Sequence, residues 1–414
     1  MSNTSLRRVV VTGIGVVSPV GNTPDTFFNA LINGQSGIKR LESEFTDQLE
    51  AKLAAQATFD GTEHFTKQEL ALLDRVSQFA LYSAREALKD SNLDLATMNL
   101  DRMGSFIGTG MGGSSSTEEG YDRLFNLKAR RLKPFTVLMA MNGAAASQIA
   151  MHFKLKGPNI TYTTACSSSA VAIGEAYRQI KHGYTDAAFA GGTEALLTFG
   201  TIKAWEALRT LAEEDPDDPT ASCKPFSLNR TGLVLGEGAA VLILEEMEMA
   251  KARGAKIYGE ITGYGLTNDG DHITQPSVEG QSRAMKSALA DAKLHPSDIG
   301  YINAHGTGTL LNDATETAAI KNVFGSHAHQ IPVSSTKSMH GHLMGAAGAV
   351  EITATLLALV KKELPPTINL KESDPACDLD YVPNQKRVLK ELNHVMSNSF
   401  AFGGTSGVII MSKV

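Results

Sequence analysis

The chain has 414 residues, of which 42% are hydrophobic and 20% charged, with 38 glycines and a formal net charge of −6. This length exceeds one ordinary hydrophobic core, and the composition is typical of a glycine-rich α/β protein built from two units. The negative charge excludes a general affinity for nucleic acid or anionic membranes. Three scattered cysteines without a CxxC spacing exclude a disulfide framework and argue against a structural zinc site.

The first predicted element is a strand with a Gly/Ser/Pro turn over residues 7–21. Its apolar run follows two arginines, as in a signal peptide, but glycines interrupt it and no A-x-A cleavage pattern follows. The β-branched residues of the run indicate a buried strand. Because no other run is long enough to span a bilayer, we expect a cytoplasmic protein.

Strands and helices alternate along the rest of the first half, which predicts an α/β architecture with a buried sheet. The pattern gives an amphipathic helix at 77–94, a strand at 103–108, a strand and helix at 159–182, and a strand at 187–190.

The second half of the chain repeats short motifs of the first half in the same order. The TGIG of residues 12–15 returns as TGYG at 262–265, and a second strand at 331–335 echoes the one before Cys166. Phe189–Thr193 is echoed by Phe402–Thr405. Three echoes in the same order predict a duplicated unit, with halves 1–250 and 251–414.

Cys166 lies between a β-prone run and a stretch of small residues that can form a buried helix. This order places its thiol at a helix N-terminus, where unpaired N–H groups favour thiolate and can bind an oxyanion. The alternative is a small buried hydrophobe.

Two histidines also follow predicted strands. His305 ends the strand at 299–302, while His342 and Lys337 precede a helix of small residues in which Glu351 needs a partner, for which Lys337 is the candidate. A cysteine with histidines is typical of nucleophilic catalysis. A zinc site that uses His340 and His342 is the less favoured alternative.

Two further motifs could have no functional role. The glycines of residues 108–113 satisfy GxGxxG, but no small-residue helix or ribose-binding acid follows, so dinucleotide binding is weakly indicated. Lys128, Arg130, Arg131 and Lys133 form a basic run in an acidic protein. A solvated surface is favoured over a docking patch for an acidic partner.

Several motifs together resemble the β-ketoacyl-[acyl-carrier-protein] synthases, closest to the elongating type II group of the Cys-His-His class. The similarity covers nearly the whole chain. It implies the thiolase fold, with two pseudo-repeated α/β halves in a five-layer αβαβα sandwich, and a homodimer. The motifs are TACSSS around Cys166, NAHGTGT at His305, SSTKSMHGH at 334–342, GAAGAVE at 345–351, PPTINL at 365–370 and NSFAFGGTSG at 398–407.

The resemblance also implies a reaction. Cys166 would take an acyl chain from acyl carrier protein, with the N–H groups of Cys166 and Phe402 as the oxyanion hole. His305 and His342 would bind the malonyl thioester during decarboxylation, and the carbanion would attack the acyl-cysteine. Both substrates carry phosphopantetheine on the carrier protein, so no further cofactor and no metal is implied.

Other roles follow from the same resemblance. Lys337, Glu351 and Asp313 would support the site, and Phe402 would be a gating aromatic. The acidic carrier protein would dock on Lys128, Arg130, Arg131 and Lys133. Substrate binding is implied for Met111, at the base of the acyl tunnel, and for Thr274, Thr307, Thr309 and Phe400.

Some positions depart from the family pattern. His340 stands where Thr is common, Ala401 stands in place of a glycine, and Ser406 stands in place of an asparagine. Residues 310–312 replace a Pro-x-Gly run, and the serines of Ser167–Ser169 are uncommon after the cysteine. These changes leave the nucleophile and both histidines intact. Two pathways remain open: fatty acid elongation, and a polyketide or polyene pathway in which the chain could act with a partner subunit. A non-catalytic chain-length partner would lack Cys166, and a thiolase would use coenzyme A esters.

Overall fold

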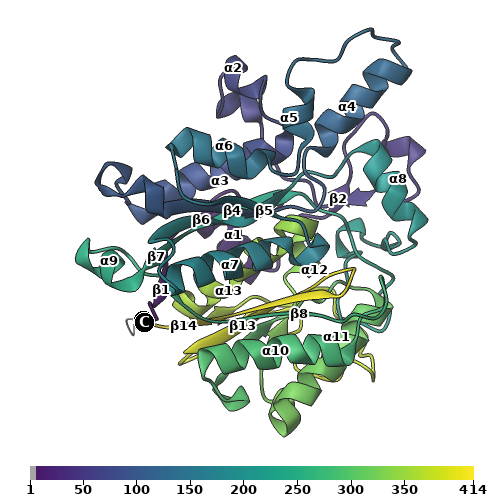
Figure 1. Ribbon diagram of the computed structural model, residues 1–414. Helices are drawn as coiled ribbons and strands as arrows, with labels where there is room; N and C mark the ends of the chain where they lie inside the picture. The colour runs from purple at the N-terminus through teal and green to yellow at the C-terminus, as the bar shows by residue number, and fades with distance from the viewer. Residues whose placement is uncertain (1–5) are drawn as a thin grey trace.

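The structure is a computed structural model and describes residues 6–414. Ten strands form one continuous sheet in the order β10-β9-β13-β14-β8-β1-β7-β6-β4-β5 (Figure 1). Five strands come from each half of the chain: β1 (Val9–Val17), β4 (Met103–Gly108), β5 (Asn159–Tyr162), β6 (Ala187–Glu194) and β7 (Gly238–Glu246), then β8 (Gly259–Asn268), β9 (Tyr301–Asn303), β10 (Val333–Ser334), β13 (His394–Phe400) and β14 (Thr405–Ser412).

The two halves of the sheet have the same topology. Numbered within each half, the strands lie in the order first, fifth, fourth, second, third. In both halves the first two pairings are antiparallel and the last two are parallel. The halves meet where Val9–Val11 of β1 pairs antiparallel with Gly259–Ile261 of β8. This repetition confirms the predicted duplication.

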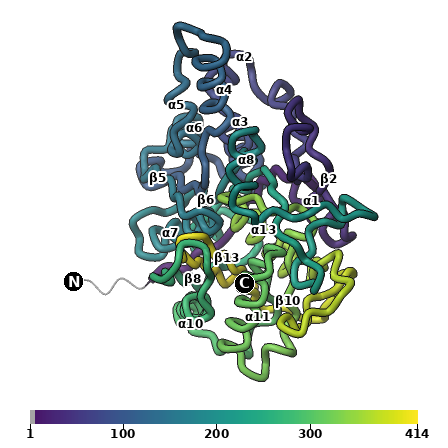
Figure 2. Tube along the Cα trace, turned by 90° about the vertical axis from the view of Figure 1, so that its right-hand side faces the viewer, coloured from purple at the N-terminus to yellow at the C-terminus, as the bar shows by residue number. Residues whose placement is uncertain are grey.

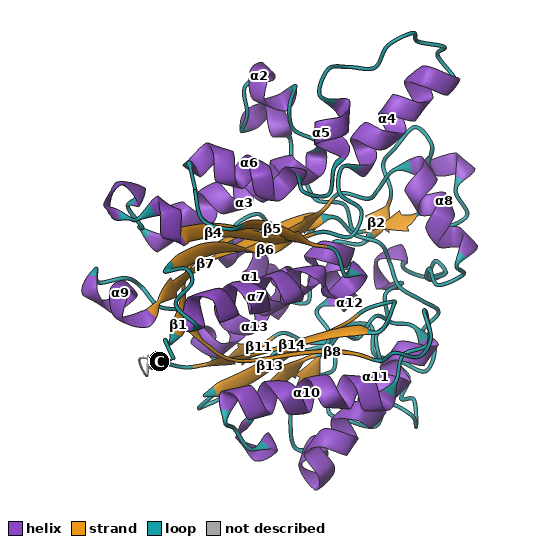
Figure 3. Ribbon diagram, viewed as in Figure 1, coloured by secondary structure: helices purple, strands orange, loops and turns teal. Residues whose placement is uncertain are grey.

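Helices complete a five-layer sandwich, which is the thiolase fold expected from the motifs (Figures 1 and 3). The N-terminal half, purple to teal, lies above the C-terminal half in the turned view of Figure 2. The outer face of the first half carries α3 (Arg75–Ser91) and α6 (Ala144–Phe153), the middle layer holds α7 (Ser168–Lys181) and α13 (Ala347–Lys361), and α10 (Val278–Ala292) and α11 (Leu310–Phe324) cover the second half.

The remaining elements lie in the connections and insertions. These are α1 (Pro24–Ile32), α2 (Lys67–Leu70), α4 (Ser114–Phe125), α5 (Thr136–Ala140), α8 (Phe199–Ala207), α9 (Met247–Ala252), α12 (Lys337–His340), β2 (Lys39–Arg40), β3 (Leu53–Ala54), β11 (Glu363–Leu364) and β12 (Arg387–Val388). Residue 250, the predicted boundary, lies in α9 between the last strand of one half and the first of the next.

The repeated glycines Gly15 and Gly265 are needed for the same physical reason. A Cβ on Gly15 would lie 1.9 Å from the Ser83 carbonyl oxygen of α3, and one on Gly265 would lie 2.1 Å from the Ala284 oxygen of α10. Each first strand therefore needs glycine where a helix packs on it. The third predicted echo is wrong, because Phe189–Thr193 lies inside β6 whereas Phe402–Thr405 begins in the loop after β13.

The middle layer is packed tightly enough to fix the ends of its helices. Residues 344–361, which include α13, are long and apolar enough to cross a membrane, but 89% of that segment is buried, between the two halves of the sheet. A Cβ on Gly348 would lie 2.9 Å from the Ala170 nitrogen of α7. The segment is therefore a core helix, and its close contact with α7 places both helix N-termini side by side.

Candidate active site

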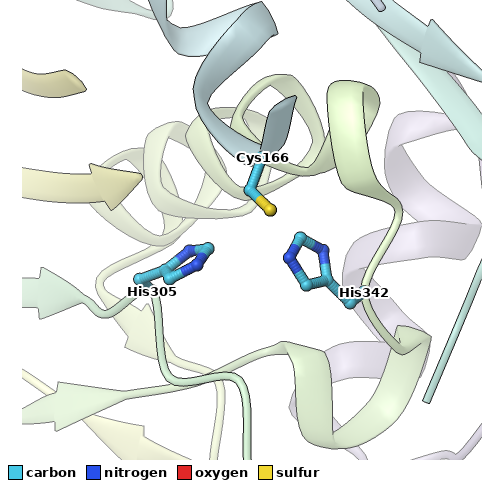
Figure 4. A group of neighbouring side chains, drawn as sticks. All are labelled: Cys166, His305 and His342. Carbon is cyan, nitrogen blue, oxygen red and sulfur yellow. The ribbon is translucent and has the colours of Figure 1, made fainter. Parts of the chain in front are cut away.

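Three side chains from distant segments meet at the N-terminal ends of the middle-layer helices (Figure 4). Cys166 lies in the 3₁₀ turn Ala165–Ser167 that opens α7, His305 follows β9, and His342 follows α12. One sulfur or nitrogen atom from each lies within 4.8 Å of the others, and all three residues are buried. The structure thus brings together the predicted nucleophile and both predicted histidines.

A sharp turn presents the cysteine. Ala165 has a left-handed φ of 49°, an uncommon value for a residue with a side chain. Burial raises the pKa of Cys166 to about 11, although the charge of Lys337 and the backbone N–H groups of Phe402 and Cys166 favour the thiolate. The predicted effect of the N–H groups on the thiolate therefore acts against a larger effect of burial.

Both histidines are neutral and turn the same kind of atom toward the sulfur. His342 Nδ1 accepts a hydrogen bond from the Met344 N–H at 3.1 Å, and His305 Nδ1 lies 3.3 Å from the Lys337 ammonium. In a neutral imidazole whose Nδ1 is an acceptor, the proton lies on Nε2. Burial, followed by the charge of Lys337, holds the pKa of both rings well below the usual value. The site therefore contains two Nε2–H donors.

Lys337 and Glu351 form the predicted pair. Both side chains are fully buried, and the ammonium binds the Glu351 carboxylate and also donates to the His305 carbonyl oxygen at 2.6 Å. A buried charge needs such a partner, because each ion alone would lose its hydration. The pair thus fixes a positive charge beside His305.

Two acids of α11 shape the loop that carries His305. Glu316 accepts the N–H groups of His305 and Gly306, each at 2.8 Å. Asp313, which the motif comparison assigned a supporting role, accepts the N–H groups of Phe226 at 2.8 Å and Gly308 at 3.3 Å. Glu316 was not predicted. The signal that could have found it is an acid one helical turn after Asp313, on the same face of a buried helix.

Glu194 is a second residue that the sequence analysis missed. It is fully buried at the end of β6 and accepts N–H bonds from Gly110, Met111 and Gly345. The donors come from both halves of the chain, and no local pattern marks such a contact.

A cavity of about 420 Å³ opens onto the three side chains. Four of the predicted substrate-binding residues and the predicted gate line it: Thr274, Thr307, Thr309, Phe400 and Phe402. Met111 is not among the residues that line it, and its side chain is 46% exposed. A role for Met111 in binding the acyl chain stays a prediction.

Comparison with protein families agrees with this geometry. A model described as "Beta-ketoacyl synthase, N-terminal domain" matches residues 6–250, and one described as "Beta-ketoacyl synthase, C-terminal domain" matches residues 258–371. The chain belongs to the beta-ketoacyl synthase family. The synthase is similar to the 3-oxoacyl-[acyl-carrier-protein] synthase 2 of Coxiella burnetii, at 43% identity over 99% of both chains, and to that of Staphylococcus aureus (strain COL), at 42% identity over 98% of both.

Solved structures of similar proteins include polyketide synthases. One shows a type II polyketide synthase acyl-carrier protein in complex with its ketosynthase bound to a hexaketide, with a TM-score of 0.91 and 34% identity. Another is the ishigamide ketosynthase/chain length factor, with a TM-score of 0.91 and 33% identity. Each alignment covers 99% of the synthase and 100% of the other chain.

The structure separates the two histidines that the zinc alternative would use. His340 is turned away from the cysteine: its Nδ1 lies 2.8 Å from the Gly341 carbonyl and its Nε2 lies 2.9 Å from the Thr336 hydroxyl. The pair of His340 and His342 is therefore not a ligand pair. Cys166, His305 and His342 each offer one ligand atom.

The basic run lies on the surface. Lys128, Arg130, Arg131 and Lys133 are exposed in the segment between α4 and α5, and Lys133 pairs with Glu119. None of the four lines the cavity. Their function stays a prediction.

Proposed function

We propose that this synthase condenses an enzyme-bound acyl chain with malonyl-[acyl-carrier-protein] to give 3-oxoacyl-[acyl-carrier-protein] in fatty acid elongation. The observation that carries the proposal is the meeting of one thiol and two Nε2–H donors in one buried cavity. Full-length similarity to 3-oxoacyl-[acyl-carrier-protein] synthases 2 supports the choice of substrates.

The first half-reaction is acyl transfer. The Cys166 sulfur attacks the thioester carbonyl of the acyl carrier protein, and the bond to the carrier's sulfur breaks. The proton of the Cys166 thiol passes to the departing sulfur, so that atoms and charge balance. The backbone N–H groups of Cys166 and Phe402, which favour negative charge on the sulfur, would stabilise the oxyanion.

The second half-reaction forms the new carbon–carbon bond. His305 and His342 donate from Nε2 to the thioester oxygen of the malonyl group, so that loss of carbon dioxide leaves a stabilised enolate. The enolate carbon attacks the acyl-cysteine, the carbon–sulfur bond breaks, and the Cys166 thiolate takes up a proton from water. Neutral rings suit this step, because each keeps a donor and the fixed charge of Lys337 lies behind His305.

The thioester arm is proposed to enter through the cavity. The hydroxyls of Thr307 and Thr309 lie 2.9 Å apart on its wall, where they can hydrogen-bond the amides of a pantetheine chain, and Thr274 lines the same space. Because both substrates bring their own phosphopantetheine, the synthase needs no cofactor of its own.

We also propose that the synthase acts as a cytoplasmic homodimer. Strand β5 is the free edge of the sheet, and its Ile160 is 38% exposed. The segment from α4 to α6 adds a run of exposed apolar side chains: Phe125, Leu127, Phe135, Val137, Leu138 and Met141. An apolar surface beside an unpaired strand favours association with a second copy, which would also cover Met111.

A ketosynthase of a polyketide or polyene pathway is the alternative. It is favoured by the close structural match to the polyketide ketosynthase with its acyl-carrier protein and to the ishigamide ketosynthase/chain length factor. In that case the apolar surface would bind a different subunit. The reaction at Cys166 would be the same, and the acyl chains accepted would differ.

Intact-protein mass spectrometry with acyl carrier protein thioesters of several chain lengths tests the proposal. We expect an acyl adduct on Cys166 that disappears as 3-oxoacyl product forms after malonyl carrier protein is added. Cys166→Ala should form no adduct, whereas His305→Ala and His342→Ala should acylate but condense at least about a hundredfold more slowly. Condensation by Cys166→Ala at the unaltered rate would overturn the mechanism. Absence of an adduct with every saturated chain would favour the alternative pathway.

A further inference from the structure

Trp205, the single tryptophan of the chain, lies against an active-site residue. Its ring stacks on the ring of Phe402, with centroids 6.0 Å apart and planes inclined by 24°. Trp205 is not among the residues that line the cavity. The mechanism proposed above gives it no role.

The helix that carries Trp205 is held firmly at both ends. At its start, the Glu118 carboxylate accepts the N–H groups of residues 199–200 at 2.9 and 2.6 Å. Near its end, Glu206 accepts the N–H groups of residues 50–51 at 2.7 and 3.0 Å. Between these ties, Ile202 is buried in the apolar cluster that contains Cys166, and Trp205 packs on that cluster one helical turn later. Helix α8 is therefore a fixed platform beside the nucleophile.

The segment around Phe402 is tied by main-chain hydrogen bonds: the Gly403 N–H donates to the Ile273 carbonyl oxygen at 2.7 Å, and the Gly404 N–H donates to the Ala401 carbonyl oxygen at 3.0 Å. Gly403 and Gly404 follow Phe402 with φ values of 83° and 79°, the left-handed region that favours glycine. A Cβ on Gly403 would meet nothing within 4 Å. Among the aromatic rings of residues 6–414, Trp205 alone stacks on Phe402. The main-chain bonds hold the flanking residues, and the contact with Trp205 holds the Phe402 ring itself.

We propose that Trp205 is a positioning residue whose ring holds the Phe402 side chain and thereby keeps the Phe402 N–H directed at the Cys166 sulfur. The inference rests on the proposed function for the use of that N–H in acyl transfer. It extends that function to a residue on another element that does not line the cavity.

Alkylation of Cys166 by iodoacetamide tests the inference without any acyl substrate. The Phe402 N–H favours the thiolate, so its loss should raise the pKa of Cys166 and slow alkylation. We expect Trp205→Ala to react about tenfold more slowly at pH 8, with the pH profile displaced upward by about one unit. Trp205→Phe should restore most of the rate, because a second ring can still stack.

A matched control comes from the same helix. Phe199 packs against the same apolar cluster, but its ring lies against that of Phe45, with centroids 5.7 Å apart and planes inclined by 56°, and not against Phe402. Phe199→Leu should alkylate within about twofold of the unaltered protein. Peptide mapping assigns the adduct to Cys166 and separates it from Cys223 and Cys377, which are also buried.

Two further measurements connect the contact with catalysis. Tryptophan emission comes from Trp205 alone, so Phe402→Leu should shift it, and an unchanged spectrum would contradict the stacking. Trp205→Ala should lower kcat for acyl transfer about tenfold, with KM for the acyl carrier protein little changed. The inference is overturned if Trp205→Ala alkylates at the unaltered rate or if Phe199→Leu is equally slow. Failure of acyl transfer in the unaltered protein would instead contradict the proposed function and leave the alkylation result valid.

Discussion

Glu194 links the two halves of the molecule beside the reactive sulfur. Its carboxylate accepts N–H groups from Gly110 at 2.7 Å and Met111 at 3.0 Å in one half, and from Gly345 at 2.8 Å in the other. Burial raises the pKa of Glu194 to about 7 although these donors favour its charged form. Its charge also opposes the thiolate of Cys166. One carboxyl group therefore affects both the stability of the fold and the state of the nucleophile.

Replacing Glu194 with glutamine should make stability respond differently to pH. The pKa of Glu194 is higher in the folded chain than the ordinary value of 4.5, so only the folded state binds this proton between about pH 7 and 4.5. The unaltered protein should therefore gain stability relative to Glu194→Gln as the pH falls through that window, by about 3 kcal/mol in total. Urea unfolding at pH 8, 6 and 5 measures the difference. A difference that stays constant with pH would contradict the assignment.

At the scale of the element, the first strand of each half packs closely against one helix of that half. A Cβ on Gly265 would lie 2.1 Å from the Ala284 carbonyl oxygen and 2.7 Å from the Ala288 nitrogen of α10. Both neighbours are main-chain atoms, which cannot move aside as a flexible side chain can. The helix would have to shift away from the sheet, with loss of packing along its length.

Gly265→Ala should accordingly destabilise the fold by about 3 kcal/mol or more. Gly143→Ala is the control, because Gly143 has a φ of −72° and an added Cβ would have only the Thr161 hydroxyl as a neighbour, at 4.0 Å. Denaturant unfolding should show a large loss for the first variant and a change of less than about 0.5 kcal/mol for the second. Equal stability of the two variants would show that α10 adapts to the added methyl group.

Local patterns predicted the elements that carry the chemistry. The strand at 103–108 agrees with β4, the helix at 77–94 agrees with α3 within three residues at each end, and Cys166 does open a buried helix. Such features depend on short stretches of sequence, in which strand propensity and turn residues are visible. The reactive residues stand out for the same reason, since each follows a strand.

Contacts between distant segments leave no such pattern in the sequence. Glu316 reaches the N–H of His305 from a different element, Glu194 bridges the two halves, and Trp205 meets Phe402 across the cavity wall. The net effect of burial on Cys166 also depends on the assembled core and not on its neighbours in sequence. These properties arise from packing, which a single sequence does not display.

At the scale of the whole molecule, the edge strand β5 is the surface proposed to bind a second copy. Ile160 lies on the free edge strand β5, and a charge there would oppose strand pairing and apolar contact together. We expect Ile160→Arg to halve the mass measured by light scattering. Val388→Arg is the matched control, since Val388 is 66% exposed on β12, away from this edge. A dimer that survives Ile160→Arg would contradict the proposed interface.

Recognition of the carrier protein belongs to the same scale. Arg130 and Arg131 project from an otherwise acidic molecule, outside the cavity in which the chemistry occurs. A carrier protein rich in acidic residues would be attracted there over a range of about 10 Å at 0.1 M salt. Attraction of this kind affects binding and the rate of encounter and leaves the chemical step unchanged.

Reversing both charges should therefore raise KM for malonyl carrier protein about tenfold or more, while kcat stays within about twofold. Lys286→Glu is the control, because Lys286 is exposed on α10 at the opposite face of the sandwich. Added salt should raise KM of the unaltered protein steeply and that of Arg130→Glu/Arg131→Glu only slightly, since the variant has little attraction left to screen. The same KM for both proteins at low salt would place the docking surface elsewhere. An equal rise with Lys286→Glu would show that net charge, and not this segment, controls the encounter.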